Sequence, residues 1–516
     1  MEYKMLEVLL KGLEYRILGC DGEELAADKS GEAVRNTRVF SITNDSRKAS
    51  EGALFFCIKG ANSDGHDYAQ TAASQGASVL VTEHPVKIEA AEGAPVIVCV
   101  PSTRYAMALI SAAWYEHPAK RMKMIGITGT KGKTTTTYLI RSILEHAGVR
   151  MGLIGTIESL YTVDDPEAEG GRRLVRVPAN NTTPESIVLQ RVLKEMADAG
   201  TEAVVMEVSS QALMMDRTAG ILYDIGLFTN LSPDHIGPNE HSSFEEYLHC
   251  KSLLFQQSKV GIFNGDDPHV QQILEGHTCE VETFGLGTGN DLYADDLQLI
   301  HVPGKLGIAF DTEGPIHISA QVPTPGKFSV YNALAAIAVC RHFKVEPPVI
   351  VSALASAHVK GRIEMVDVSD DFTLMIDYAH NAVALESLLT TLREYDPGRL
   401  VTVFGCGGNR SRSRRFEMGE VSGKLSDLTI ITSDNPRFEE PMDIIADIVT
   451  GIEKTSGKYV TIPDRKDAIR YAIRNGQPGD IIVLAGKGHE DYQEICGKKY
   501  PMDERVLIAE ILAEEA

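Results

Sequence analysis

The string GITGTKGKTTTTYLIRSILEHAG, residues 126–148, decides the fold of the middle of this chain. An apolar run over residues 124–127 predicts a strand that leads directly into a glycine-rich loop. Residues 139–144 then carry apolar pairs at i, i+4 spacing and Gly148 follows them, which predicts a helix that ends at this glycine. A strand, a glycine-rich loop and a helix in this order are typical of a phosphate-binding site.

Each residue type in the loop suits a bound triphosphate. Gly129 and Gly132 let backbone N–H groups approach phosphate oxygens, and the start of the helix adds favourable partial charge. Lys133 places a point charge on the β and γ phosphates, and the Thr134 hydroxyl suits Mg²⁺. The usual Walker spacing needs a glycine where Ile127 stands, so the loop is a shortened variant. We predict an ATP-consuming enzyme.

Two further side chains outward from the loop are candidate metal ligands. Glu207 ends the apolar run EAVVMEVSS, residues 202–210, and a carboxylate there can hold Mg²⁺, which prefers oxygen ligands. His235 lies in the polar loop LSPDHIGPNEH, residues 231–241. Lys251 lies on a helix-like stretch, and taken by itself it is interpreted as a surface lysine.

Apolar runs alternate with helical stretches through most of the chain, which predicts βαβ units and parallel sheets. In the last third, four such runs end in Gly- or Asp-rich loops, and open α/β sheets bind ligands at the carboxyl ends of their strands. We expect an α/β protein of three domains, residues 1–118, 119–362 and 363–516. The central domain has a P-loop ATPase-like parallel sheet and the C-terminal one is Rossmann-like. Residues 276–325 are predicted only as irregular or β.

Composition narrows the partners. The 516 residues are 43% hydrophobic and 24% charged, with a net charge of -22, which argues against a nucleic-acid partner. Eight scattered cysteines without a CxxC pair are typical of a reducing compartment. The N-terminus does not resemble a signal peptide, and no run approaches the roughly 20 apolar residues of a membrane span. We expect a cytoplasmic monomer with no membrane insertion.

The motifs resemble those of one family when they are taken together. GTKGKTTTT, EVSS, SPDH, the helical Lys251, YNALAA, GRIE and DYAH occur in the order seen in Mur ligases, which form amide bonds with ATP in bacterial cell-wall synthesis. GCGGNR, SDNPRFEEP and AGKGHEDYQ resemble the MurE type, which adds the third amino acid to UDP-N-acetylmuramoyl-L-Ala-D-Glu. NDSR and GHDY fit the nucleotide-sugar domain of that type, and the resemblance spans residues 44–505.

The resemblance implies a set of ligand-binding residues. ATP is expected at Gly129, Thr130, Lys131, Gly132, Lys133, Thr134, Thr135, Asn332, Arg362 and Asp377. The UDP-sugar dipeptide is expected at Ser46, Asn181, Thr182, Thr183, Ser209 and Arg217. Mg²⁺ is expected on Thr134, Glu207, His235 and a carbamylated Lys251, and the catalytic set is Lys133, Glu207, His235 and Lys251.

The implied reaction passes through an acyl phosphate. A carboxylate is a poor electrophile, so the D-Glu carboxylate first attacks the ATP γ-phosphate, and the incoming amine then displaces phosphate. Lys133 and Mg²⁺ would neutralise the charge that moves during phosphoryl transfer.

The third amino acid is predicted from the loop SDNPRFEEP. In the family, Asp-Asn-Pro-Arg goes with meso-2,6-diaminopimelate, whose distal carboxylate a guanidinium can grip in a bidentate fork. Burying Arg437 without such a partner would leave its charge unpaired, and Glu490 suits the distal ammonium. The implied pocket comprises Arg410, Asp434, Asn435, Pro436, Arg437, Gly486 and Glu490.

Other readings stay open at this point. Residues 236–241 resemble a subgroup with lysine-adding members, so lysine is the alternative substrate. The DNPR and GKGHE loops argue against a folylpolyglutamate synthetase, a D-Ala-D-Ala-adding ligase or a P-loop motor. A non-catalytic scaffold on the same fold has no reason to keep Lys133, Glu207 and Lys251 converging on one site.

Overall fold

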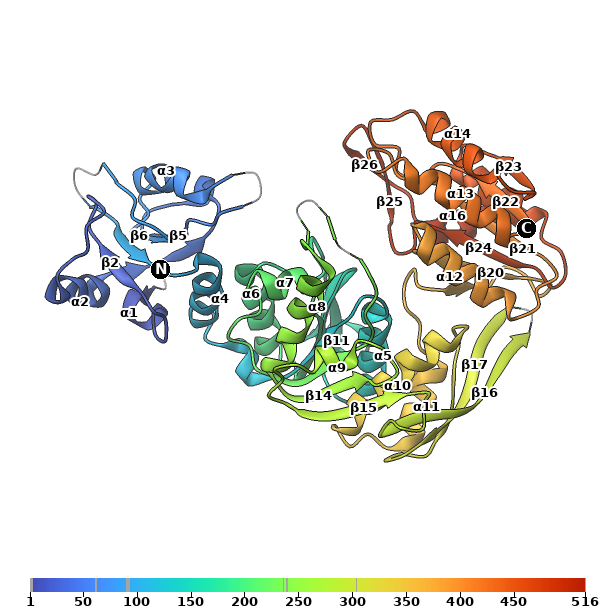
Figure 1. The fold of residues 1–516 in the computed structure, drawn as a ribbon, viewed down its shortest axis with the longest axis horizontal. Coiled ribbons are helices and arrows are strands. Elements are labelled where there is room, and N and C mark those ends of the chain that lie inside the picture. Colours follow the sequence, from blue (N-terminus) through green and yellow to red (C-terminus); the bar gives the residue numbers. More distant parts are fainter. Residues whose placement is uncertain are drawn as a thin grey trace. The chain divides into compact units, whose positions relative to one another are not determined.

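The computed structural model describes residues 3–60, 63–89, 93–234, 236–237, 240–302 and 304–515. The chain forms two compact units, Met1–Phe284 and Gly285–Ala516. Sheets with helices packed on them make up both units, which confirms the predicted α/β class (Figure 1). The boundaries at residues 118 and 362 stay a prediction. No helix among the described residues is long and apolar enough to cross a membrane.

The first unit begins with a five-stranded sheet in the order β2-β7-β6-β5-β4. Its strands are β2 (Arg16–Leu18), β4 (Ser41–Thr43), β5 (Ala53–Phe56), β6 (Val79–Thr82) and β7 (Val96–Cys99), and only β2 runs antiparallel to its neighbour. The helices are α1 (Leu6–Leu9), α2 (Ala27–Asn36), α3 (Ala69–Ser74) and α4 (Thr103–Trp114). Strands β1 (Lys4–Met5) and β3 (Arg38–Val39) form a separate pair. The strands β5 to β7 are apolar runs buried on both faces, as expected of parallel strands.

The same unit contains a second sheet, in the order β11-β10-β9-β12-β8-β13-β14-β15. Strands β9 (Met151–Ile154), β12 (Ala203–Glu207), β8 (Lys123–Thr128), β13 (Tyr223–Phe228), β14 (Ser258–Asn264) and β15 (Glu280–Gly285) are parallel. Strands β10 (Glu158–Asp164) and β11 (Arg172–Pro178) extend it antiparallel. Its helices are α5 (Lys133–His146), α6 (Ser186–Asp198), α7 (Ser210–Met214), α8 (Phe244–Ser252) and α9 (Val270–Ile273). The carboxyl ends of β8, β12 and β13 therefore meet at one edge, where the phosphate loop begins.

The second unit opens with three antiparallel strands, β16 (Leu292–Val302), β17 (Lys305–Glu313) and β18 (Ser319–Val322). With β15 they make residues 276–325 largely β, which resolves the part of the chain that the sequence left as irregular or β. Helices α10 (Lys327–Arg341) and α11 (Pro347–Ala355) follow. Helix α10 is apolar nearly all round and is buried along its length.

The remaining sheet has the order β19-β20-β24-β21-β22-β23. Its strands are β19 (Glu364–Val366), β20 (Thr373–Asp377), β21 (Leu400–Phe404), β22 (Leu428–Ile431), β23 (Tyr459–Thr461) and β24 (Ile481–Ala485), parallel except for β19. Helices α12 (Ala382–Arg393), α13 (Ser413–Leu425) and α14 (Pro441–Ile452) share one core, and α15 (Arg465–Arg474) and α16 (Glu504–Glu515) share the other. This doubly wound arrangement confirms the Rossmann-like prediction.

Candidate active site

The phosphate loop joins β8 to α5 as the sequence predicts. Gly132 caps the helix with φ 85°, in the left-handed region that favours glycine. Gly129 has φ 143°, and a Cβ there would lie 2.0 Å from the Thr229 hydroxyl oxygen. Both glycines are therefore required by the local backbone, and they bring the loop N–H groups to the start of α5.

Two lysines converge on this loop. The Nζ atoms of Lys133 and Lys251 each donate to the Gly129 carbonyl, both at 2.8 Å. Lys251 is only 1% exposed, so the interpretation of an ordinary surface lysine was wrong: its helix turns this face toward the loop. Burial, together with the nearby charge of Lys133, lowers the pKa of Lys251 well below its ordinary value. Its ammonium also lies 4.4 Å from the centre of the Tyr247 ring.

Glu207 ends β12, the strand that pairs directly with β8, and its carboxylate is buried beside the loop. It accepts hydrogen bonds from the Thr134 hydroxyl at 3.0 Å, from the Thr156 backbone N–H at 2.9 Å and from the Thr156 hydroxyl at 3.0 Å. A surface position for Glu207 is thus excluded. A buried carboxylate and a hydroxyl in contact form an oxygen donor set that fits Mg²⁺. His235, the remaining predicted ligand, lies outside the described residues.

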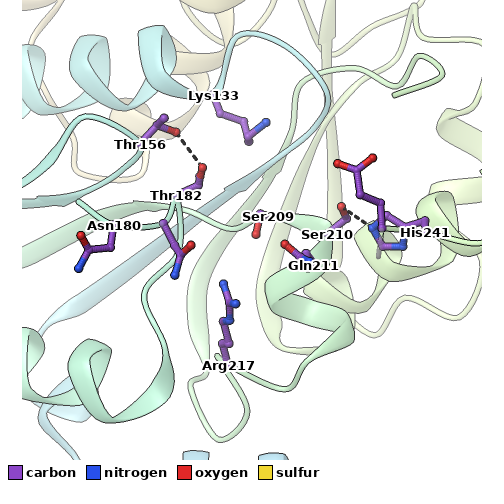
Figure 2. A pocket seen from close by; sticks show the side chains of 11 residues that line it. Lys133, Thr156, Asn180, Thr182, Ser209, Ser210, Gln211, Arg217 and His241 are labelled. Carbon is purple, nitrogen blue, oxygen red and sulfur yellow. Dashed lines mark hydrogen bonds between the residues drawn. The ribbon is translucent and has the colours of Figure 1, made fainter. Parts of the chain in front are cut away.

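A pocket of about 330 Å³ opens next to these groups. Its lining residues come from α5, from α7 and the segment after it, from the loops after β9, β11 and β12, and from the loop before α8: Lys133, Thr156, Asn180, Asn181, Thr182, Ser209, Ser210, Gln211, Arg217, Glu240 and His241. Figure 2 shows the hydroxyls of Thr156 and Thr182 facing each other and the guanidinium of Arg217 pointing into the pocket. The cations Lys133 and Arg217 share one polar cavity, which suits an anionic ligand.

Most residues expected to bind the UDP-sugar dipeptide lie in or behind this pocket. Thr183 is fully buried and donates to the Glu207 backbone carbonyl, so it supports the wall. Arg217 donates to the Thr183 carbonyl at 3.0 Å and pairs with Glu185 at 2.6 Å. Ser209 caps α7. Ser46 lies apart from this lining, in the short helix after β4.

The second unit holds the other residues that the resemblance assigns to ATP. Arg362 lies over the Tyr378 ring at 4.7 Å. Burial raises the pKa of the neighbouring Asp377, although Arg362 and backbone N–H groups oppose that rise. His489 also contacts Tyr378, and burial lowers its pKa to about 4, so its ring is neutral at physiological pH. Asn332 is buried within α10.

The loop after β22, which carries Asp434 to Arg437, corrects one part of the sequence argument. Arg437 is not left without a partner: its Nε donates to a Glu494 carboxylate oxygen at 3.0 Å and its Nη1 donates to the Gly408 carbonyl at 2.8 Å. The energetic cost of burying an unpaired guanidinium therefore gives no argument for diaminopimelate as the substrate. Arg410 is exposed, and its stem lies beside Gly407 in the same loop cluster.

Glu490, expected to meet the distal ammonium, also has an internal partner. Lys487 is fully buried, and its Nζ donates to Glu490 at 2.7 Å and to the Asn435 side-chain oxygen at 3.0 Å. Asn435 donates in turn to Glu490 at 2.9 Å. Gly486, with φ 105°, approaches Asp434 closely enough that a Cβ would lie 3.1 Å from its carboxylate. The predicted loops after β22 and β24 thus come together across the end of β21, the strand that lies between them in the sheet.

Sequence reasoning missed several of these residues. Thr156 and His241 line the pocket although neither was singled out, and His241 lies within the quoted 231–241 string. Lys487 stands inside the quoted AGKGHEDYQ motif, so that motif was the available signal. Glu494 carries no such signal, because only the hairpin of β25 (Tyr492–Ile495) and β26 (Lys498–Pro501) brings it to Arg437.

Comparisons with known proteins agree with this geometry. Family models match over three segments: Mur ligase family, catalytic domain, residues 38–115; Mur ligase middle domain, residues 127–340; and Mur ligase, glutamate ligase domain, residues 361–488. The chain is 41% identical over 484 residues to the UDP-N-acetylmuramoyl-L-alanyl-D-glutamate--2,6-diaminopimelate ligase of Geobacillus thermodenitrificans, covering 92% of this chain and 94% of that protein. It is 41% identical over 509 residues to the protein of the same name from Caldanaerobacter subterraneus, with 98% of each covered.

A solved structure of a ligase with this name superposes with a TM-score of 0.66 at 27% identity, covering 93% of this chain and 96% of that one. A phosphate loop beside a buried carboxylate, in a fold shared with these relatives, defines an ATP-dependent ligase. The chain belongs to the Mur ligase family. Its role is that of a ligase in peptidoglycan synthesis.

Proposed function

We propose that the chain joins meso-2,6-diaminopimelate to the D-Glu carboxylate of UDP-N-acetylmuramoyl-L-Ala-D-Glu, with hydrolysis of ATP to ADP and phosphate. The observation that carries the proposal is the meeting of Arg437, Asn435, Asp434 and Glu490 in one loop cluster of the second unit. The printed names of relatives 41% identical to the chain support the same substrates. A guanidinium and a carboxylate in this cluster match the carboxylate and the ammonium at the distal end of diaminopimelate.

The first chemical step has a physical basis in the pocket of the first unit. The acceptor carboxylate is activated by attack on the γ-phosphate, which gives an acyl phosphate that the amine then attacks. Lys133 and the backbone N–H groups of the loop offset the negative charge of the phosphates during transfer. Arg217, in the same pocket, supplies a second cation that can orient an anionic substrate.

Mg²⁺ is proposed on oxygen ligands at the same place. Thr134 and Glu207 are in contact and suit a hard cation, and a carbamate on Lys251 would add a carboxylate-like ligand. When bound, the ion supplies charge neutralisation on the phosphate oxygens. Lys251 is buried against Gly129, so a modification there faces the loop. His235 is proposed as a ligand from the family resemblance alone.

Lysine is the second candidate for the added amino acid, and one observation favours keeping it. Because Arg437 is already paired with Glu494, binding of lysine, which has no distal carboxylate, would not leave the guanidinium without a partner.

A cytoplasmic monomer stays the predicted state of the protein. The free thiols of all eight cysteines fit a reducing compartment.

The test is ATP-dependent phosphate release with UDP-N-acetylmuramoyl-L-Ala-D-Glu and one amine at a time: diaminopimelate, lysine or ornithine. We expect release with diaminopimelate, and an Arg437→Ala variant should lose at least tenfold in kcat/KM for that amine. Arg470→Ala, which removes a partly exposed arginine paired with Glu514 on helices α15 and α16, serves as the matched control and should retain activity. Release with lysine alone would overturn the proposed amine specificity.

A further inference from the structure

The loop carrying Arg437 is joined to strand β25 along the backbone. The Arg437 N–H donates to the Glu494 carbonyl at 3.0 Å, and the Arg437 carbonyl accepts from the Cys496 N–H at 2.7 Å. Arg437 has φ 53°, a left-handed conformation that a non-glycine residue adopts only when its surroundings hold it. The β25–β26 hairpin thus fixes the backbone position and conformation of Arg437.

The side chain is held at two further points. Its Nε donates to the Glu494 carboxylate and its Nη1 to the Gly408 carbonyl. No other hydrogen bond of this guanidinium is found among the described residues, so its Nη2 edge remains available to a ligand. Glu494 is the only acidic group bonded to it within the part of the chain that the structure describes.

The site therefore contains two internal ion pairs, Arg437–Glu494 and Lys487–Glu490. Asn435 links them, because its side-chain oxygen accepts from the Lys487 Nζ and from the Glu494 N–H. The distal end of diaminopimelate carries one carboxylate and one ammonium. When diaminopimelate enters this site, the two charged groups proposed to bind its distal end, Arg437 and Glu490, already have ion-pair partners.

We propose that Glu494 is a specificity-determining residue that acts as the internal counter-ion of Arg437 and competes with the distal carboxylate of the amino-acid substrate. This inference rests on the proposed function. With Glu494 in place, the guanidinium is neutralised in an empty site and in a site filled by lysine. Diaminopimelate must instead share the guanidinium with a second carboxylate. Glu494 therefore reduces the difference in kcat/KM between diaminopimelate and lysine.

The expected effect is moderate because the pair is partly exposed, 22% for Arg437 and 25% for Glu494. Glu494→Gln keeps the shape and an acceptor for Nε but removes the charge. We expect the KM for diaminopimelate to fall about fivefold, which corresponds to about 1 kcal/mol, with kcat changed by less than about twofold. The kcat/KM for lysine should stay the same or fall, because its ammonium would face an uncompensated guanidinium.

The experiment measures phosphate release at saturating ATP and UDP-N-acetylmuramoyl-L-Ala-D-Glu for wild type, Glu494→Gln and Glu494→Ala, with diaminopimelate and lysine titrated separately. Glu420→Gln is the matched control, because it removes a carboxylate from an exposed pair with Lys424, away from the loops after β22 and β24. Thermal unfolding of each variant checks that it is folded.

A higher ratio of kcat/KM for diaminopimelate over lysine in Glu494→Gln supports the proposal. An unchanged ratio, or a higher KM for diaminopimelate in both Glu494 variants, overturns it, because Glu494 would then only hold Arg437 in place. Wild type separates this from a failure of the proposed function: if wild-type enzyme turns over lysine but not diaminopimelate, the substrate assignment itself is wrong.

Discussion

Replacing Arg465 with methionine is expected to destabilise the C-terminal sheet by an amount that depends on pH. Arg465 and Glu504 form an ion pair at 2.8 Å whose side chains are 2% and 0% exposed. Arg465 also donates to the carbonyls of Ser433 at 3.3 Å and Ala485 at 2.9 Å. These carbonyls directly precede Asp434 and Gly486, so the same side chain supports both amino-acid-binding loops.

The magnitude follows from what the variant leaves behind. Without Arg465, the buried Glu504 carboxylate must either stay charged and unpaired or take up a proton. Burial already raises the pKa of Glu504, with Arg465 opposing the rise, and removal of Arg465 raises it further. Protonating a carboxyl of ordinary pKa about 4.3 costs roughly 3.5 kcal/mol at pH 7 and about 1 kcal/mol at pH 5. The lost bonds to two carbonyls add about 1 kcal/mol each at either pH.

The sign of the pH dependence is fixed by this argument. A carboxyl whose pKa is higher in the folded state stabilises that state only below its unfolded pKa, and the stabilisation is lost as the pH rises. The loss of stability in Arg465→Met should therefore be larger at pH 7 than at pH 5, by at most about 2–3 kcal/mol because the raised pKa of Glu504 already gives the wild type part of this pH dependence.

Amide hydrogen exchange of the α16 peptide reports the local opening free energy in the full chain, which matters because two compact units need not unfold together. Arg470→Met, which breaks a partly exposed pair between α15 and α16, is the control and should cost about 1 kcal/mol or less. If Arg465→Met lowers the opening free energy equally at pH 5 and pH 7, the unpaired Glu504 carboxylate is not the main cause of the destabilisation.

Two other variants address the catalytic loops. Lys251→Ala should lower turnover at least a hundredfold and regain part of it when a short carboxylate such as formate or acetate is added; turnover equal to wild type would contradict a ligand role for this lysine. Gly408→Ala places a Cβ 1.9 Å from the Pro436 carbonyl oxygen, so the KM for diaminopimelate should rise at least tenfold while the KM for ATP stays within about twofold. Gly289→Ala, where a Cβ meets open space, should leave both KM values unchanged, and equal values in Gly408→Ala would show that this loop does not form the amine site.

The sequence alone determined the class of fold and the phosphate loop. Local patterns suffice there, because an apolar strand, spaced glycines and a helix lie within one short segment, and Gly129 and Gly132 adopt the backbone that their residue type predicts. Strands β8 and β12 and the four buried strands β20, β21, β22 and β24 were visible for the same reason: parallel strands covered on both faces are continuous apolar runs. The ordered motifs then indicated the family, which the relatives show.

Only the tertiary structure decided which charges neutralise which. The burial of Lys251 depends on the packing of α8 against the loop, and a helix sequence does not state which face is covered. The partners of Arg437 and Glu490 come from residues 57 positions and three positions away, and the more distant one reaches Arg437 only because a hairpin folds back onto the loop after β22. Charge pairing is set by distances in space, so it becomes readable only once the chain has folded.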